Sequence, residues 1–168
     1  MTLVHRHMIE SKHAFGLVAE CDGRIVGYMT ASSDCKAFSR EFVRRHGLMA
    51  AVTAFPRLFL PTNIEVVLKG LFHFRHQKAD DPNAEIIAGA VLAEYQGSGI
   101  YRRLSDRALS ILKERGCKRA MLSTVDPNNS RARQFYDRYG WVAVRDQAFY
   151  RDTVVSIYHL DLTTWHPR

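Results

Sequence analysis

The sequence predicts a mixed α/β (α+β) fold, because a β-hairpin is followed by a strand–turn–helix–strand unit. Residues 15–20 and 24–31 are two apolar, β-branched runs, and the Asp22-Gly23 pair between them is typical of a tight hairpin turn. A third apolar run, residues 86–92, leads through a glycine turn into a helical pattern. A hairpin and a right-handed crossover between parallel strands together predict a mixed sheet flanked by helices.

Composition narrows the class of protein. With 168 residues, 46% of them hydrophobic, the chain is expected to form a single domain over residues 1–168. The net charge of +7 suits an anionic ligand such as a polyphosphate nucleotide, a nucleic acid or an acidic surface, without choosing among them. The three cysteines are odd in number and form no CxxC pair. This pattern favours a reduced, cytoplasmic setting and argues against a zinc site. We expect no metal, no secretory signal and no transmembrane segment.

The N-terminal residues 1–13 are polar and contain a His5-x-His7 pair. Two histidines at this spacing could ligate a metal, but a frayed or partly packed terminus is the favoured interpretation.

Residues 35–83 are predicted to form a helical insertion after the hairpin. Apolar residues recur at helical spacing until Pro56 and Pro61 break the pattern, and residues 64–74 predict a second helix before a turn at 80–83. The segment is basic and rich in aromatic residues, so it could contact a membrane surface or a nucleic acid. We favour the alternative that it packs on the core or on a second subunit, with its charges solvated.

The C-terminal half continues the alternation of helices and strands. The elements expected there are a helix over 101–115, a strand over 119–125, a helix over 131–139, and strands over 141–145 and 153–160. Gly116 and Gly140 stand where left-handed helix caps are expected. The strand at 119–125 should pair in parallel with the run at 86–92.

The turn Gln96-Gly97-Ser98-Gly99 lies between that central strand and the helix that follows it. Glycines let a backbone approach a ligand closely, and the first N–H groups of a helix point toward an anion. A strand, a glycine turn and a helix N-terminus therefore predict a phosphate-binding loop.

Residues 85–141 resemble the GNAT superfamily of acyl-CoA-dependent N-acyltransferases. The family's (Arg/Gln)-x-x-Gly-x-(Gly/Ala) loop corresponds to the segment from Gln96 to Tyr101, and the hairpin at 15–31 also looks like part of the family's sheet. A second family motif follows in the correct order, at full spacing: Asn129, Ala132, Tyr136, Gly140 and Trp141. The resemblance implies a centrally splayed sheet and acetyl-CoA (coenzyme A) as co-substrate.

The resemblance also implies roles for particular residues. The backbone of the central strand should pair with the pantetheine arm, and the turn and first helical residues should bind the pyrophosphate. The expected cofactor-binding residues are Gly89, Ala90, Val91, Gln96, Gly97, Ser98, Gly99, Ile100, Tyr101, Arg102 and Asn129. Tyr136 occupies the general-acid position, where a phenol can protonate the leaving thiolate. Tyr136 could instead be a core aromatic, and Asn129 could simply cap a helix.

The sequence departs from the family pattern in three places. Tyr101 stands where the family prefers Gly or Ala, so it could crowd the diphosphate or alter the helix start. Thr124 occupies the position that some members fill with a catalytic glutamate, which makes Glu85 the better candidate for the base, acting through water. Only about fifteen residues precede the hairpin, whereas the family usually has a strand and two helices there.

These observations predict an N-acetyltransferase that acts on a primary amine, with an amino sugar or another small anionic molecule as a candidate acceptor. The alternative is a catalytically degenerate module that binds acyl-CoA or a partner without turnover. A nucleic-acid binder ranks lowest, because no readout motif is present. A homodimer is compatible with the sequence.

Overall fold

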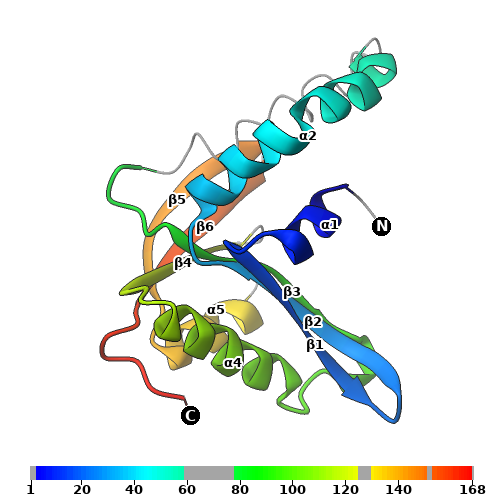
Figure 1. Ribbon diagram of the computed structural model, residues 1–168. Helices are drawn as coiled ribbons and strands as arrows, with labels where there is room; N and C mark the ends of the chain where they lie inside the picture. The colour runs from blue at the N-terminus through cyan, green and yellow to red at the C-terminus, as the bar shows by residue number, and fades with distance from the viewer. Residues whose placement is uncertain (1–2, 59–77, 125–129, 151–152, 168) are drawn as a thin grey trace.

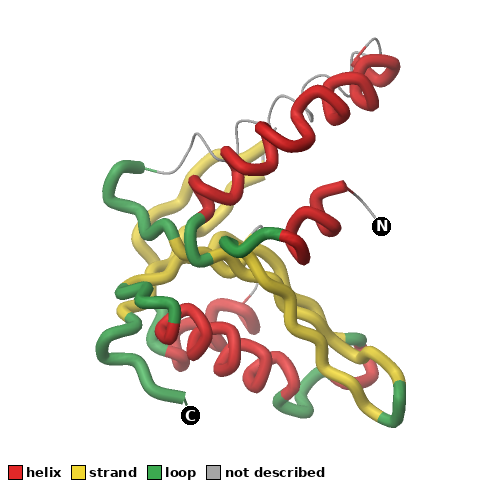
Figure 2. Tube along the Cα trace, viewed as in Figure 1, coloured by secondary structure: helices red, strands yellow, loops and turns green. Residues whose placement is uncertain are grey.

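The computed structural model describes residues 3–58, 78–124, 130–150 and 153–167. Its centre is a six-stranded sheet with the order β1-β2-β3-β4-β6-β5, in which the β3–β4 ladder is parallel and the other ladders are antiparallel. Helices α1 and α2 lie on one side of this sheet, and α4 and α5 lie on the other (Figure 1). The same layers are visible in the tube of Figure 2. The predicted fold class, a mixed sheet flanked by helices, is confirmed.

The predicted N-terminal hairpin is present as β1 (Ala14–Cys21) paired with β2 (Arg24–Ser32). Asp22 and Gly23 have φ angles of 51° and 74°, the left-handed conformations that a two-residue turn needs. Helix α1 (Leu3–Glu10) packs beside β1.

The N-terminal segment is packed rather than frayed. The His7 side chain in α1 is fully buried, with its ring 5.1 Å from the rings of both Phe38 and His46 of α2 (distances between centroids). The contact holds α1 against α2, so the two helices form one layer over the sheet.

Helix α2 (Cys35–Leu58) accounts for the first part of the predicted 35–83 insertion. Its first turn is capped by Asp34, whose Oδ1 accepts a hydrogen bond from the Ala37 N–H at 2.9 Å. The helix continues two residues past Pro56, which was expected to break it, and so ends within one turn of the proline. The helix expected over 64–74 lies outside the described residues.

The central strands diverge, as the resemblance implied. β3 (Ala84–Val91) pairs with β4 (Arg119–Thr124) through three residues only, which end at Ile86, although both strands continue beyond that point. The register of β3 against β2 shifts at Ile87, so this residue is a β-bulge. A bulge bends its strand and re-aims the side chains that follow, and here it lies where the two strands part.

Helices α4 (Ile100–Glu114) and α5 (Ser130–Tyr139) border the main core, on the face opposite α1 and α2. The α4 helix buries one stripe, formed by Ile100, Leu104, Ser105, Ala108, Leu109 and Leu112. Gly116 and Gly140 follow the two helices with φ angles of 82° and 92°, so both predicted left-handed caps are present. After α4 the Cys117 N–H donates to the Leu112 carbonyl at 3.0 Å, which closes the cap.

The C-terminal strands are β5 (Val142–Tyr150) and β6 (Thr153–Asp161), which pair antiparallel, with β6 beside β4. β5 is longer than the predicted strand at 141–145, because tertiary partners satisfy the polar residues in its middle. Arg145 pairs with Asp81, and Asp146 accepts a hydrogen bond from Ser156 at 2.6 Å. In the described part of the chain, no helix has the length and apolar character needed to cross a membrane.

Candidate active site

The splay between β3 and β4 leaves part of a central strand uncovered. The Ile87 side chain is 38% exposed and residues 88–90 are exposed as well, although β3 lies in the middle of the sheet. Gly89, Ala90 and Val91 pair with β2 on one side, while β4 pairs with β3 no further than Ile86. Among the described residues, no strand pairs with the second edge of these residues, which leaves it open to an extended ligand, the arrangement expected for the pantetheine arm.

The glycine turn after β3 adopts left-handed backbone conformations that are compatible with the predicted phosphate-binding loop. Gly97 and Gly99 have φ angles of 84° and 82°, and a side chain would be strained at either position. Helix α4 begins at Ile100, and no side chain in the described ranges caps its N-terminus. Its first N–H groups thus remain available to an anion.

Within this turn the Ser98 backbone N–H is already engaged, since it donates to the Tyr95 carbonyl at 3.4 Å. The Ser98 hydroxyl donates to the same carbonyl at 2.6 Å. The Gln96 side chain turns back to the Val91 carbonyl at 3.4 Å, so it braces the loop against the strand. Among the predicted pyrophosphate ligands, the geometry favours the amides that follow Ser98.

Tyr101 does not disturb the helix start, because α4 opens normally one residue before it. Its side chain packs beneath β3, and a Cβ on Gly89 would lie 3.1 Å from Tyr101 Cε2. The ring also meets Phe135 of α5 edge to face, with a centroid distance of 5.2 Å. Tyr101 therefore fills the floor of the splay, and a larger residue at Gly89 would press on its ring and on Met29.

Tyr136 comes from α5 and lies on the same floor. Its half-buried ring is 5.2 Å from the Tyr158 ring and 5.7 Å from the Phe135 ring. Burial raises the pKa of Tyr136, and a hydrogen bond from Tyr101 opposes that rise by favouring the phenolate. Tyr136 is thus both a packed aromatic residue and a phenol near the splay. Asn129, the other residue of this motif that was expected to contact the cofactor, lies outside the described residues.

Glu85 lies on the opposite side of the sheet, toward α2. The side chain is 6% exposed, and its Oε2 accepts a hydrogen bond from the Cys35 thiol at 3.3 Å. Burial raises the pKa of Glu85 to about 7; the Cys35 hydrogen bond lowers it, and the nearby charge of Asp81 adds to the rise. A carboxyl group with this pKa can accept a proton at neutral pH.

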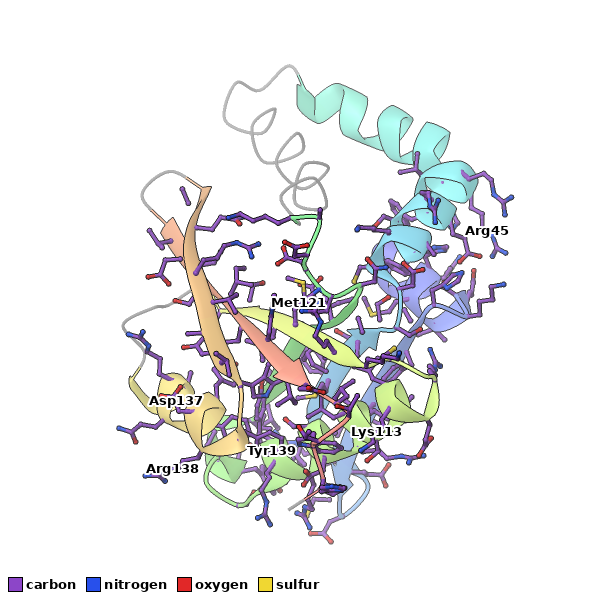
Figure 3. All side chains as sticks on the ribbon, turned by 90° about the vertical axis from the view of Figure 1, so that its left-hand side faces the viewer. Arg45, Lys113, Met121, Asp137, Arg138 and Tyr139 are labelled. Atoms are coloured by element: carbon purple, nitrogen blue, oxygen red, sulfur yellow. The ribbon has the colours of Figure 1, made fainter. Side chains whose placement is uncertain are left out.

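Asp81, next to Glu85, joins a buried ion network that the sequence did not predict. Its two carboxylate oxygens accept hydrogen bonds from Arg145 at 2.7 and 2.6 Å, and His159 Nε2 lies 3.2 Å from Oδ1. Arg145 holds the pKa of Asp81 below its usual range, so Asp81 stays charged. One signal in the sequence pointed to such a network: Arg145 and Asp146 lie next to each other in β5, and a charged arginine inside a strand needs a partner of opposite charge. Met121 of β4 is the register partner of Glu85 of β3 and marks this part of the sheet in Figure 3.

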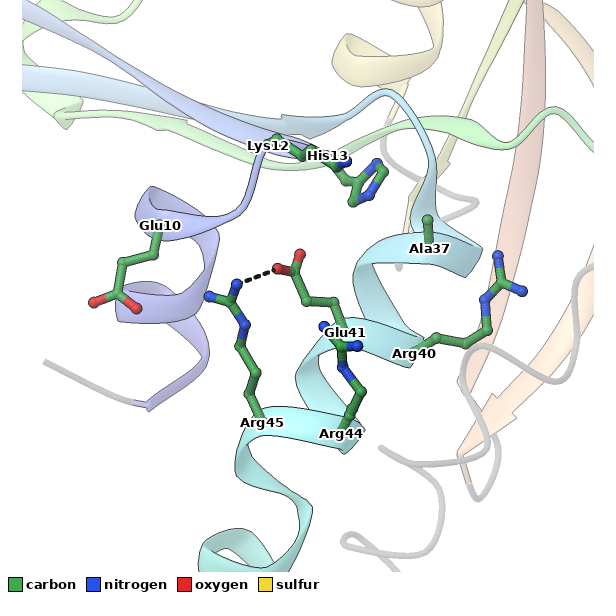
Figure 4. Close-up of a pocket in the computed structure, with 8 residues that line it drawn as sticks. All are labelled: Glu10, Lys12, His13, Ala37, Arg40, Glu41, Arg44 and Arg45. Carbon is green, nitrogen blue, oxygen red and sulfur yellow. Dashed lines mark ion pairs between the residues drawn. The ribbon is translucent and has the colours of Figure 1, made fainter.

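A cavity of about 520 Å³ lies between α1, the start of β1 and α2 (Figure 4). Its lining carries more positive than negative charge: Glu10, Lys12, His13, Ala37, Arg40, Glu41, Arg44 and Arg45. Glu41 accepts a hydrogen bond from Ser11 at 2.6 Å and pairs with Arg45 at 3.0 Å.

In the part of the chain that the structure describes, no group of three or more metal-ligating side chains is found.

Comparison with solved structures identifies the fold. The chain superposes on SsHAT with a TM-score of 0.63 and 23% identity, over 94% of this chain and 77% of that one. A protein from Bacillus anthracis assigned as a streptothricin acetyltransferase, solved with acetyl coenzyme A, gives 0.60 and 17% over 96% and 69%. The ribosomal-protein-S18-alanine N-acetyltransferase from Escherichia coli gives 0.56 and 13% over 90% and 71%.

No curated protein sequence matches this chain significantly. The family model described as Acetyltransferase (GNAT) family, however, matches residues 2–141, which include the hairpin, the splayed strands, the glycine turn and Tyr136. The chain therefore belongs to the GNAT family of acetyltransferases, which confirms the family, the enzyme class and the acetyl-CoA co-substrate expected from the sequence.

Proposed function

We propose that this enzyme transfers the acetyl group of acetyl-CoA directly to a primary amine, with Glu85 as the base and Tyr136 as the acid, and that residues 1–168 act as one domain. The observation that carries the proposal is the position of the two side chains on opposite faces of the sheet near the point where β3 and β4 part. Glu85 belongs to the last paired stretch of β3, and Tyr136 packs on Tyr158, which pairs with β4 at Leu122.

The proposed course of the reaction follows from this arrangement. With the pyrophosphate at the N-terminus of α4 and the pantetheine along Gly89–Val91, the thioester reaches the end of the splay. A neutral amine attacks the carbonyl carbon, and its proton passes through water to Glu85. The C–S bond then breaks, and Tyr136 protonates the thiolate, since a phenol can transfer its proton to this leaving group.

Substitution of the two residues tests these roles. Glu85→Gln and Tyr136→Phe should each lower kcat by about 100-fold, while calorimetry with coenzyme A gives an unchanged Kd. Tyr28→Phe, on an exposed part of β2, is the matched control and should behave as the wild type. A normal kcat in either catalytic variant would remove that residue from the mechanism.

For the acceptor, we propose a small anionic amine, such as an amino sugar that carries a phosphate. The support is the cationic cavity between α1 and α2, on the side of the sheet that Glu85 faces. Glucosamine 6-phosphate and glucosamine present the same amine with and without the charge. Arg44→Ala combined with Arg45→Ala should raise KM for the phosphorylated sugar only, and Arg107→Ala on α4 should not. Equal KM values for both sugars in the wild type would contradict the proposal.

A second candidate is a module that binds acyl-CoA without turnover, and the Tyr101 ring in the floor of the splay favours it. The discriminating experiment is incubation of acetyl-CoA with a panel of primary amines, together with the slow hydrolysis of its thioester. CoA release that disappears in Tyr136→Phe supports the enzyme. Tight CoA binding without release from any amine supports the binding module.

A further inference from the structure

Cys35 is the first residue of α2, and the chain around it is firmly held. Its backbone N–H donates to the Asn83 carbonyl at 2.9 Å, and Asp34 caps the helix that follows. The side chain is fully buried, and its Sγ lies 3.3 Å from Glu85 Oε2, which is fifty residues away in the sequence. The start of the helix and the candidate base are thus joined directly.

The charged and titratable groups around Glu85 come from several elements. Asp81, before β3, carries a negative charge that disfavours a second one, although Arg145 of β5 and His159 of β6 engage it. On α2 the neighbour is the Cys35 thiol, which burial and the Glu85 charge keep protonated by raising its pKa. Ser32 of β2 pairs with Glu85 and does not titrate. A protonated thiol is a hydrogen-bond donor, so it favours the charged carboxylate.

We propose that Cys35 is a positioning residue for the acetyl transfer: its S–H group holds one oxygen of Glu85 and fixes the carboxylate relative to helix α2. The inference rests on the proposed role of Glu85 as the base. Helix α2 would then have two roles: it positions Glu85 through Cys35, and it lines the cationic cavity with Ala37, Arg40 and Arg44. The helix that lines the cavity is thus the same helix that holds the proposed base.

The test separates the Cys35–Glu85 contact from catalysis. Side-chain carboxyl carbons of glutamate are labelled with ¹³C, and the Glu85 signal is assigned by its loss in Glu85→Gln. Its titration midpoint is compared in the wild type, Cys35→Ala and Cys35→Ser. Cys117→Ala is the control, because that thiol contacts the Ser33 carbonyl rather than Glu85. The pH dependence of kcat/KM is then measured with a primary amine that the panel above identifies.

Cys35→Ala removes the donor, so the Glu85 midpoint and the acid limb of kcat/KM should both move to higher pH by about one pH unit. Cys35→Ser keeps a donor and should restore both toward the wild type. Equal midpoints in Cys35→Ala and Cys117→Ala would overturn the proposal. If the midpoint moves but the acid limb survives in Glu85→Gln, Glu85 is not the base and the positioning role falls with it.

Discussion

Replacing Glu85 by glutamine should change how the stability of the protein depends on pH. The pKa of Glu85 is about 7 in the folded protein and 4.5 in the absence of the fold. Because the folded pKa is the higher one, the unfolded state releases this proton first. The stabilising contribution of the protonated carboxyl is complete below pH 4.5 and is lost as the pH rises to 7.

The size of the effect follows from the two pKa values. Their difference corresponds to about 3 kcal/mol, of which about 2.5 kcal/mol is lost between pH 5 and pH 8. Glutamine does not titrate. As the pH rises from 5 to 8, the free energy of unfolding of Glu85→Gln should therefore rise by about 2.5 kcal/mol relative to that of the wild type. For a domain of this size, that gain corresponds to a relative rise in Tm of about 5–10 °C.

The assay is urea unfolding of both proteins at pH 5 and pH 8, with the two free energies of unfolding compared at each pH. Other groups titrate equally in both proteins, so the difference isolates Glu85. Glu94→Gln serves as the control, because Glu94 is exposed and forms a surface ion pair with Arg24 at 3.3 Å. A wild type and a Glu85→Gln variant with parallel pH dependence would refute the argument from burial.

Three further predictions follow from other parts of the molecule. Acetyl-CoA at about 100 times its Kd should stabilise the protein by about 2.7 kcal/mol, and a Tm unchanged by acetyl-CoA and by coenzyme A would contradict the assigned loop. Tyr101→Ala should leave the helix start intact and keep this Tm shift; loss of the shift would mean that the ring supports the cofactor site. Asp81→Asn should lower the free energy of unfolding by about 3 kcal/mol, because it leaves Arg145 without its buried partner. Urea unfolding measures this loss, and a difference below 1 kcal/mol would show that the pair behaves as a surface contact.

Local signals in the sequence were sufficient for most of the fold. The Asp22-Gly23 turn, the caps at Gly116 and Gly140 and the glycine turn before α4 each depend on the conformations of a few consecutive residues. Those conformations are governed by backbone sterics, which neighbouring residues reveal. The C-terminal end of β5 could not be predicted in this way. Arg145 and Asp146 are stable in a strand only when residues from other elements form ion pairs or hydrogen bonds with them.

The sequence by itself determined the family and the order of most elements from the hairpin onward, and it named the residues expected to bind the cofactor. Only the tertiary structure decided the environment of those residues. Cys35 and Glu85 are fifty residues apart, and Asp81 and Arg145 are sixty-four apart, yet each pair forms a hydrogen bond. The pKa of a carboxyl group depends on its burial and on the charges beside it, and folding sets both by bringing distant residues together. A motif can therefore name a candidate base, whereas its readiness to accept a proton at neutral pH is a property of the folded chain.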